Sequence, residues 1–219
     1  MSVTVVKCGG AALDQRALAA TRLGEARETV VVHGAGPRIS SALAEAGIVS
    51  TFVGGRRVTT ADALPHVRAA FAAANRELCS QLGPRAVGLL GDELGLRAEP
   101  LPELGEAGML APHVPPLLWE LLAAGSLPVI APLASGPLNV NADDAASVLA
   151  VALGAARLVF VSDVPGVLVD GKVVPRLRAS DIPQLNGSLS GGVVPKLEAA
   201  VAAARAGIRV ELGGTLVVA

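Results

Sequence analysis

Short runs of valine, isoleucine and leucine alternate along this chain with longer segments rich in alanine, leucine, arginine and glutamate. The short runs are apolar on both faces, as strands are when helices cover both sides of a parallel sheet, and the longer segments have helical spacing. The expected strands are residues 3–7, 29–33, 86–90, 127–133, 157–163 and 208–212, and the expected helices are residues 15–27, 37–46, 61–81, 115–124, 142–153 and 195–206. This alternation predicts an α/β fold, an open and mostly parallel sheet sandwiched between helices.

Glycine-containing turns interrupt this alternation at three places. Gly54-Gly55 separates two β-prone pieces within residues 50–60, and Asp170-Gly171 does the same within residues 166–177. Such pairs supply the positive φ angles of a two-residue hairpin turn, so we expect two hairpins. Residues 186–192, NGSLSGG, precede a predicted helix and are compatible with either a lid or a linker.

Length and charge limit the possible partners. The 219 residues favour one domain spanning residues 1–219, and the formal net charge is −1. A near-neutral chain lacks the electrostatic footprint of a protein that binds nucleic acid or an anionic membrane, so any bound anion needs a local site. Residues 121–142 carry no charge, but glycines, prolines and polar residues divide them, and we expect no membrane span.

The cysteines and histidines show no metal-ligand spacing. Cys8 and Cys79 lie far apart, and His33, His66 and His113 are scattered. With no secretory signal at the start of the sequence, two isolated cysteines predict a protein of the reducing cytoplasm.

Lys7 ends the first predicted strand, and Gly9 and Gly10 follow it. A charge at the end of a buried strand is costly unless it reaches a crevice or a partner, and open α/β sheets bind ligands outside the carboxyl ends of their strands. Glycines at that position let backbone N–H groups approach an anion closely. The alternative is a lysine that extends into water over a plain glycine turn.

A second glycine turn, Gly34-Ala35-Gly36, follows the second predicted strand. Pro37 suits the first turn of a helix, and a helix N-terminus behind a glycine turn can bind an anion. Because neither the dinucleotide nor the Walker pattern is complete, a purely structural turn remains an alternative.

Arg57 follows the glycines of the first predicted hairpin. It either clamps a carboxylate through two parallel hydrogen bonds or lies exposed on the hairpin. Thr60 or Asp62 is expected to cap the helix that follows.

Residues 139–144, NVNADD, place two amides and two carboxylates directly after an apolar run. Asn141 suits a helix N-cap, and Asp144 suits the first turn, so both have an ordinary helix-start role. Asn139 and Asp143 remain without such a role.

Lys196 occupies the first turn of another predicted helix, since Pro195 suits the first helical position. A cation there opposes the helix dipole by about 0.3–1 kcal/mol, a cost that disappears if the same place holds a phosphate.

Taken in order, VKCGG, VHGAG, GGRRVT, NVNAD, SDVPGV and GGVVPK resemble the amino acid kinase family, and most closely its acetylglutamate-phosphorylating branch. The resemblance covers nearly the whole chain. It implies the three-layer fold of that family and ATP-dependent phosphorylation of the side-chain carboxylate of N-acetyl-L-glutamate, in the second step of arginine biosynthesis. It also implies an acyl-amino-acid lobe at about residues 1–135 and a nucleotide lobe at about residues 136–219.

The resemblance assigns a role to each matching position. Lys7 would stabilise the transferring phosphoryl group, Lys196 would hold the ATP phosphates on the leaving side, and Asp143 would hold both lysines. Mg²⁺ would enter with ATP, bound mainly through the phosphates rather than by a protein metal site. The implied substrate-binding residues are Gly34, Ala35, Gly36, Arg57 and Asn139, and the implied nucleotide-binding residues are Gly9, Gly10, Ser162, Asp163 and Gly166.

Several positions depart from the family pattern. Ala35 stands where glycine is usual, which would strain the backbone if its φ angle were positive. Gly54 stands where asparagine is usual. Cys8 next to the phosphoryl site is expected to be a small hydrophobic residue, with sensitivity to thiol reagents as the alternative. The sequence closes with TLVVA where relatives carry roughly another helix, which would thin the nucleotide half.

An N-terminal helix that builds hexamers in arginine-inhibited relatives is absent, and we expect an arginine-insensitive homodimer. Two alternatives stay open: an aminoadipate kinase of lysine biosynthesis, acting on an N-acetylated or carrier-linked substrate, and a non-catalytic sensor with the same fold.

Overall fold

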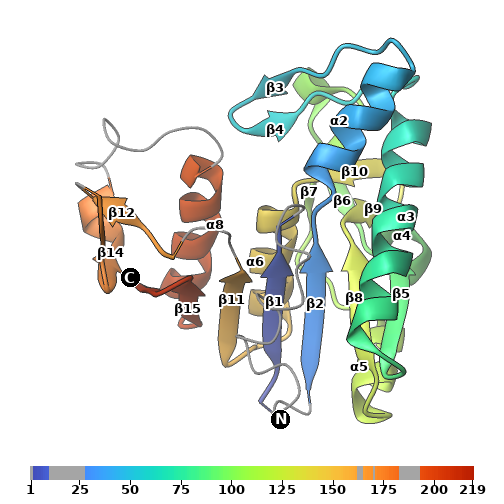
Figure 1. Cartoon of the computed structure of the whole chain (residues 1–219). Coiled ribbons are helices and arrows are strands. Elements are labelled where there is room, and N and C mark those ends of the chain that lie inside the picture. Colours follow the sequence, from blue (N-terminus) through green and yellow to red (C-terminus); the bar gives the residue numbers. More distant parts are fainter. Residues whose placement is uncertain (1, 10–27, 162–164, 170, 183–192) are drawn as a thin grey trace.

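The computed structural model describes residues 2–9, 28–161, 165–169, 171–182 and 193–219 (Figure 1). Its largest sheet has eight strands in the order β14-β16-β15-β11-β1-β2-β8-β5. Every neighbouring pair is parallel except β15 and β16, so the sheet is mostly parallel, as predicted. The strands are β1 (Thr4–Cys8), β2 (Thr29–His33), β5 (Ala86–Leu90), β8 (Leu127–Ala131), β11 (Arg157–Val161), β14 (Arg176–Arg178), β15 (Arg209–Leu212) and β16 (Thr215–Val218).

Helices cover both faces of this sheet, which confirms the predicted α/β class. The helices are α2 (Gly36–Glu45), α3 (Leu64–Leu82), α4 (Gly91–Leu94), α5 (Pro116–Ala123), α6 (Ala142–Ala152) and α8 (Val193–Arg205). On one face, Val5 and neighbouring strand residues join a core cluster with α5, α6 and α8. On the other face, Val6 and Cys8 pack against α3. Since successive strand residues point to opposite faces, Lys7 points with Val5 toward α6 and α8.

A second, smaller sheet carries part of the cavity described below. Its strand order is β6-β7-β10-β9, with β6 (Ala98–Pro100), β7 (Ala107–Leu110), β9 (Leu133–Ala134) and β10 (Leu138–Val140). A short 3₁₀ helix, η1 (Pro102–Leu104), lies between β6 and β7. This sheet was not predicted. The single strand expected at residues 127–133 is instead two strands in different sheets, separated at Pro132, which has no N–H for a ladder.

Two hairpins form where glycine turns predicted them. β3 (Phe52–Val53) pairs with β4 (Arg56–Arg57) across Gly54 and Gly55, whose φ angles are 54° and 74°. β12 (Leu168–Val169) pairs with β13 (Lys172–Val173), and Gly171 between them has a φ of 73°. The helix predicted at residues 15–27, the loop at residues 186–192 and Asp170 lie outside the described residues.

Helix α3 starts later than predicted. Its N-cap is Ala63, which offers no side-chain cap, so neither Thr60 nor Asp62 caps it. The carbonyl of Thr60 instead accepts hydrogen bonds from the amides of Ala63 and Leu64, 3.0 Å each, and the Thr60 hydroxyl bonds the Asp62 carboxylate. Pro65 fixes this start, because proline is tolerated only in the first turn of a helix.

Three further features differ from the predictions: the start of α8, the burial of β5 and the presence of β16. Helix α8 begins at Val193, so Pro195 is its third residue and Lys196 closes its first turn. β5 lies at the sheet edge and is half-buried rather than covered on both faces. β15 turns at Gly213-Gly214 into β16, an antiparallel strand that the sequence reading did not include.

Candidate active site

Lys7 lies near the carboxyl end of β1, in the middle of the large sheet. Its side chain is 7% exposed, and its Nζ lies 2.7 Å from Oδ1 of Asp143. The lysine is therefore buried and paired, which excludes the alternative in which it extends into water.

Asp143 is positioned by the start of helix α6. Oδ1 of Asn141 accepts hydrogen bonds from the amides of Asp143 and Asp144, at 2.8 and 3.1 Å, so Asn141 is the N-cap as predicted. Oδ1 of Asp143 also accepts a 2.8 Å hydrogen bond from Nζ of Lys196 in the first turn of α8. That ammonium lies 5.4 Å above the ring of Phe160 in β11. One carboxylate oxygen thus joins a strand and two helices.

The cluster of Lys7, Asp143 and Lys196 carries more positive than negative charge. Burial on its own would raise the pKa of Asp143, but the two ammonium groups outweigh burial and hold it below its usual value. The pKa of Lys196 is lowered, first by burial and then by Lys7, with Asp143 opposing both. The lowered pKa of Asp143 and the lowered pKa of Lys196 are consistent with each other, because two cations share one anion. Such a cluster provides a favourable place for a further anion.

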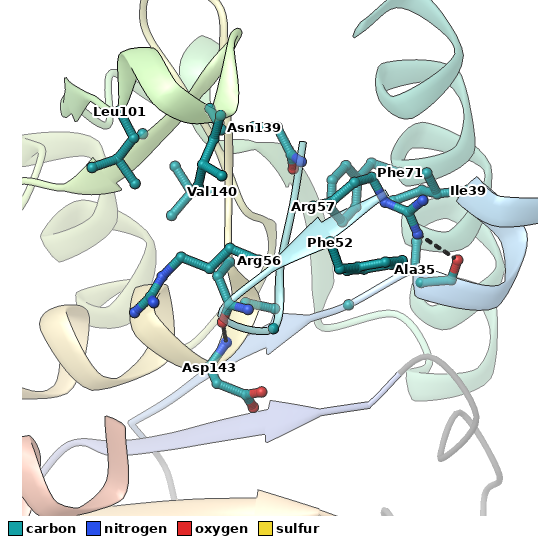
Figure 2. A pocket seen from close by; sticks show the side chains of 18 of the residues that line it. Ala35, Ile39, Phe52, Arg56, Arg57, Phe71, Leu101, Asn139, Val140 and Asp143 are labelled. Atoms are coloured by element: carbon teal, nitrogen blue, oxygen red, sulfur yellow. Dashed lines mark hydrogen bonds between the residues drawn. The ribbon is translucent and has the colours of Figure 1, made fainter. Parts of the chain in front are cut away.

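A cavity of about 230 Å³ adjoins this cluster (Figure 2). Lys7 and Asp143 line it, and so do Gly34, Gly36 and Asn139. The volume is below the roughly 300–1,000 Å³ of sites for drug-sized ligands, which suits a small metabolite.

The glycine turn after β2 leads directly into helix α2 at the cavity. Ala35 is the N-cap of α2 with a φ of −140°, a conformation open to any residue, so alanine causes no strain there. The first amides of a helix have no partner within the helix, and those of α2 begin beside the cavity. The turn can therefore offer N–H groups to an anion.

Arg57 is 7% exposed, which excludes the exposed-hairpin alternative. Its Nη2 donates to the carbonyl of Gly36 at 3.2 Å and to the hydroxyl of Ser40 at 3.0 Å, and its Nη1 donates to the hydroxyl of Ser50. The guanidinium lies 4.6 Å from the centre of the Phe52 ring, and burial lowers its pKa. These bonds use three of its five N–H groups, so at most two remain for a carboxylate.

Asn139 reaches the cavity from β10. It is 8% exposed, and its amide nitrogen donates to the Thr59 hydroxyl at 2.9 Å. The cavity thus has Arg57 and the α2 turn on one wall and Asn139 on another (Figure 2).

The residues expected to bind nucleotide are less fully described. Gly10, Ser162 and Asp163 lie outside the described residues, and Gly9 follows β1 without lining the cavity. Gly166 has a packing reason of its own: a Cβ there would come within 2.8 Å of Thr215 Oγ1, and its φ is 155°. Their contact with nucleotide stays a prediction.

Two residues near the site, Arg56 and Asp144, have contacts that the sequence did not predict, and Cys8 is the small hydrophobic residue expected there. Arg56 lines the cavity, and its Nε donates to Oδ2 of Asp144 at 2.8 Å, so Asp144 is an ion-pair partner as well as a helix-start residue. The first arginine of GGRRVT, which precedes Arg57, and the second aspartate of NADD were the available signals. Cys8 is fully buried, and burial raises the pKa of its thiol to about 12, as for an inert small hydrophobic residue.

His33 directly precedes the glycine turn and is held in place by a buried contact with Asn75. It is fully buried at the end of β2, with Nε2 3.0 Å from the side-chain amide nitrogen of Asn75. That amide also donates to the carbonyl of Val129 at 2.9 Å. Burial lowers the pKa of His33 to about 4, so the ring is neutral. The contact with Asn75 fixes His33, which directly precedes Gly34.

The described residues include neither a helix suited to a membrane span nor a cluster suited to a metal ion. No described helix has the length and apolar character needed to cross a bilayer. Within the same residues, no group of three or more His, Cys, Asp and Glu side chains could hold a metal ion.

A sequence profile of the amino acid kinase family matches residues 2–213. Acetylglutamate kinase of Chloroflexus aurantiacus is 41% identical over 94% of this chain and 89% of its own length. Acetylglutamate kinase of Geobacillus stearothermophilus is 41% identical, covering 91% and 84%.

Solved structures share the fold. One is smu.665 of Streptococcus mutans, with a TM-score of 0.85, 24% identity and coverage of 99% of this chain and 98% of that one. Another is carbamate kinase of Giardia lamblia bound to AMP-PNP, with a TM-score of 0.71, 15% identity and coverage of 99% and 98%.

Proposed function

This chain belongs to the amino acid kinase family, and from that membership we propose that it transfers the terminal phosphoryl group of ATP to the side-chain carboxylate of N-acetyl-L-glutamate. The product is an acyl phosphate, and the reaction is the second step of arginine biosynthesis. The observation that carries the proposal is the buried Lys7–Asp143–Lys196 cluster beside a cavity that also presents Arg57 and Asn139.

The acceptor has two carboxylates, and the cavity offers different groups to each. Arg57 keeps at most one N–H on Nε and one on Nη1, and either can donate a charge-assisted hydrogen bond to the α-carboxylate. Asn139 would orient the acyl amino acid from the wall formed by β10. The side-chain carboxylate then lies toward Lys7 and the amides of the α2 turn.

Phosphoryl transfer needs positioning and charge stabilisation rather than covalent participation of the protein. A carboxylate oxygen attacks the γ-phosphorus, and the bond from that phosphorus to the β–γ bridging oxygen breaks, its electron pair leaving with ADP. No proton transfer is required, because the acceptor is already anionic. Lys7 and Lys196 stabilise charge on the transferring group, and Asp143 keeps the two ammonium groups together.

We propose that the nucleotide binds on the side of α8, and the family resemblance assigns its contacts to Gly9, Gly10, Ser162, Asp163 and Gly166. Mg²⁺ would enter with ATP rather than occupy a protein metal site, and it would supply neutralisation of the phosphate charge. Asp143 is not assigned to the metal, since one of its oxygens already accepts from two ammonium groups.

The assembly and cellular location are also proposals. We expect a homodimer in the cytoplasm, a location in which unpaired cysteines such as Cys8 and Cys79 are usual. Light scattering of the purified protein tests the dimer, and hexamers in that experiment would overturn it.

Trapping of the acyl phosphate with hydroxylamine tests the function. Wild-type protein with MgATP and N-acetyl-L-glutamate should give hydroxamate, and a folded Lys196→Ala variant should give almost none. No product from folded wild-type protein would reject the proposed acceptor. Product with an N-acetylated or carrier-linked aminoadipate would then assign the other substrate, and no product with either would favour a non-catalytic sensor.

A further inference from the structure

The β3–β4 hairpin depends on the rest of the protein for its position. It forms a sheet of its own with two residue pairs, and Phe52 and Val53 on it are 55% and 57% exposed. An isolated two-stranded hairpin is at best marginally stable in water. Its placement at the cavity must therefore come from contacts with other elements.

Two adjacent arginines of the hairpin make those contacts in different directions. Arg57 binds the carbonyl of Gly36 and the Ser40 hydroxyl, and so ties the hairpin to α2. Arg56 donates to Asp144 at 2.8 Å and ties it to α6. Gly55 adds a contact with α8, where a Cβ would come within 2.4 Å of Pro195. The hairpin thereby connects α2, which borders the cavity, with α6 and α8, the helices that carry Asp143 and Lys196.

The Arg56–Asp144 ion pair is largely shielded from solvent. The two side chains are 25% and 9% exposed, unlike a fully solvated surface pair. Arg56 from β4, Asp143 from α6 and Glu198 from α8 are the charged groups that act on Asp144. Burial raises the pKa of Asp144, with Arg56 opposing that change, so the carboxylate relies on Arg56 as its cationic partner.

We propose that Arg56 and Asp144 are positioning residues, whose ion pair holds the β3–β4 hairpin against α6 and thereby sets the affinity of the cavity for its acyl-amino-acid substrate. This inference rests on the proposed function for the identity of that substrate. Asp144 directly follows Asp143 in the first turn of α6, so the pair also fixes the hairpin relative to the lysine cluster.

A double-mutant cycle of Arg56→Met, Asp144→Ala and both together tests the proposal. Each single variant should raise KM for N-acetyl-L-glutamate about tenfold, with kcat lowered less than about threefold, and the double variant should be no worse than either single. The cycle separates the pair from the effect of Asp144 on the helix dipole. Arg157→Met is the matched control, because it breaks another arginine–carboxylate pair, with Glu211, at the opposite end of the strands.

Hydrogen exchange of the 52–57 peptide supplies a readout that needs no activity. It should become faster in both single variants, faster to the same degree in the double variant, and unchanged in Arg157→Met. If Arg56→Met is poorly folded, Arg56→Lys keeps the charge and should show a smaller rise in KM. Additive effects, an unchanged KM, or unchanged exchange would each overturn the proposal. If wild-type protein makes no acyl phosphate, the proposed function fails, and exchange in the variants still decides whether the pair holds the hairpin.

Discussion

Lys7 and Lys196, one near each end of the sequence, bring their ammonium groups within 2.7 and 2.8 Å of the same carboxylate oxygen. The shared oxygen belongs to Asp143. Neither lysine could be buried there alone, because an unpaired buried charge is strongly unfavourable. The arrangement holds two cations close together with a single anion, and this excess positive charge is what an incoming phosphoryl group would meet.

Replacing Asp143 with asparagine removes the shared anion while keeping the size of the side chain. We expect kcat to fall by about 10²-fold or more, because the lysines lose their common partner and repel each other. Circular dichroism should remain that of a folded α/β protein. The measurement is kcat by hydroxamate trapping, with Asp181→Asn in the short helix η2 (Ala179–Asp181) as a control that should stay active. Normal turnover in Asp143→Asn would remove Asp143 from the mechanism.

Lys196 should set the alkaline limit of activity. Its pKa lies below the usual 10.5, by burial and by Lys7, so it loses its proton at a lower pH than a free lysine. A kcat/KM profile, which reports the groups of the free enzyme, should therefore decline from neutral pH upward with an apparent pKa below 10.5. Lys196→Arg should be less active but keep its charge, which moves the decline to higher pH. An identical decline in both proteins would assign it to another group.

Six of the eight strands of the large sheet could be predicted because they are short apolar runs, typical of covered parallel strands, whereas β14 and β16 were not predicted. The small sheet could not. β6 and β7 are short, and β10, which pairs with β7, comes after helix α5 and strands β8 and β9. Nothing local marks such a pairing, and tertiary contact decides it.

The site shows the same division. Lys7 and Lys196 could be selected because each looks misplaced locally, one at the end of a buried strand and the other as a cation at a helix start. Asp143 received its role from the family resemblance. Arg56 looks ordinary in sequence, since an arginine on a hairpin is usually exposed. Its importance arises only when the hairpin meets α6 and Asp144 lies 2.8 Å away.

Gly88 in β5 is required by the side chain of Asn75. A Cβ at this position would lie 2.1 Å from Asn75 Oδ1, so Gly88→Ala must displace the amide that holds His33. We expect a loss of about 1–3 kcal/mol in the free energy of unfolding, measured by urea denaturation. In an Asn75→Ala background the obstructing atom is gone, and the same substitution should cost less. Equal costs in both backgrounds would contradict this account.

His33 should make the protein less stable in mild acid. Its folded pKa is about 4 against an ordinary 6.5, because burial disfavours the charged ring. Between these values the unfolded chain binds a proton that the folded protein does not, so stability falls as the pH drops from 6.5 toward 4. The shift corresponds to at most about 3 kcal/mol.

The contribution of Asp143 lies in a different pH window. Its folded pKa is depressed, so its stabilisation is present above the ordinary 3.8 and is lost only as the pH falls through the lower folded value.

His33→Gln should therefore flatten the stability curve between pH 6.5 and 4, even if it lowers stability at neutral pH. Urea midpoints at half-unit pH steps measure this slope, with His113→Gln on a loop as the control. A slope that persists in His33→Gln would mean that another group takes up the proton, and His33 would then not be the buried neutral support of the glycine turn.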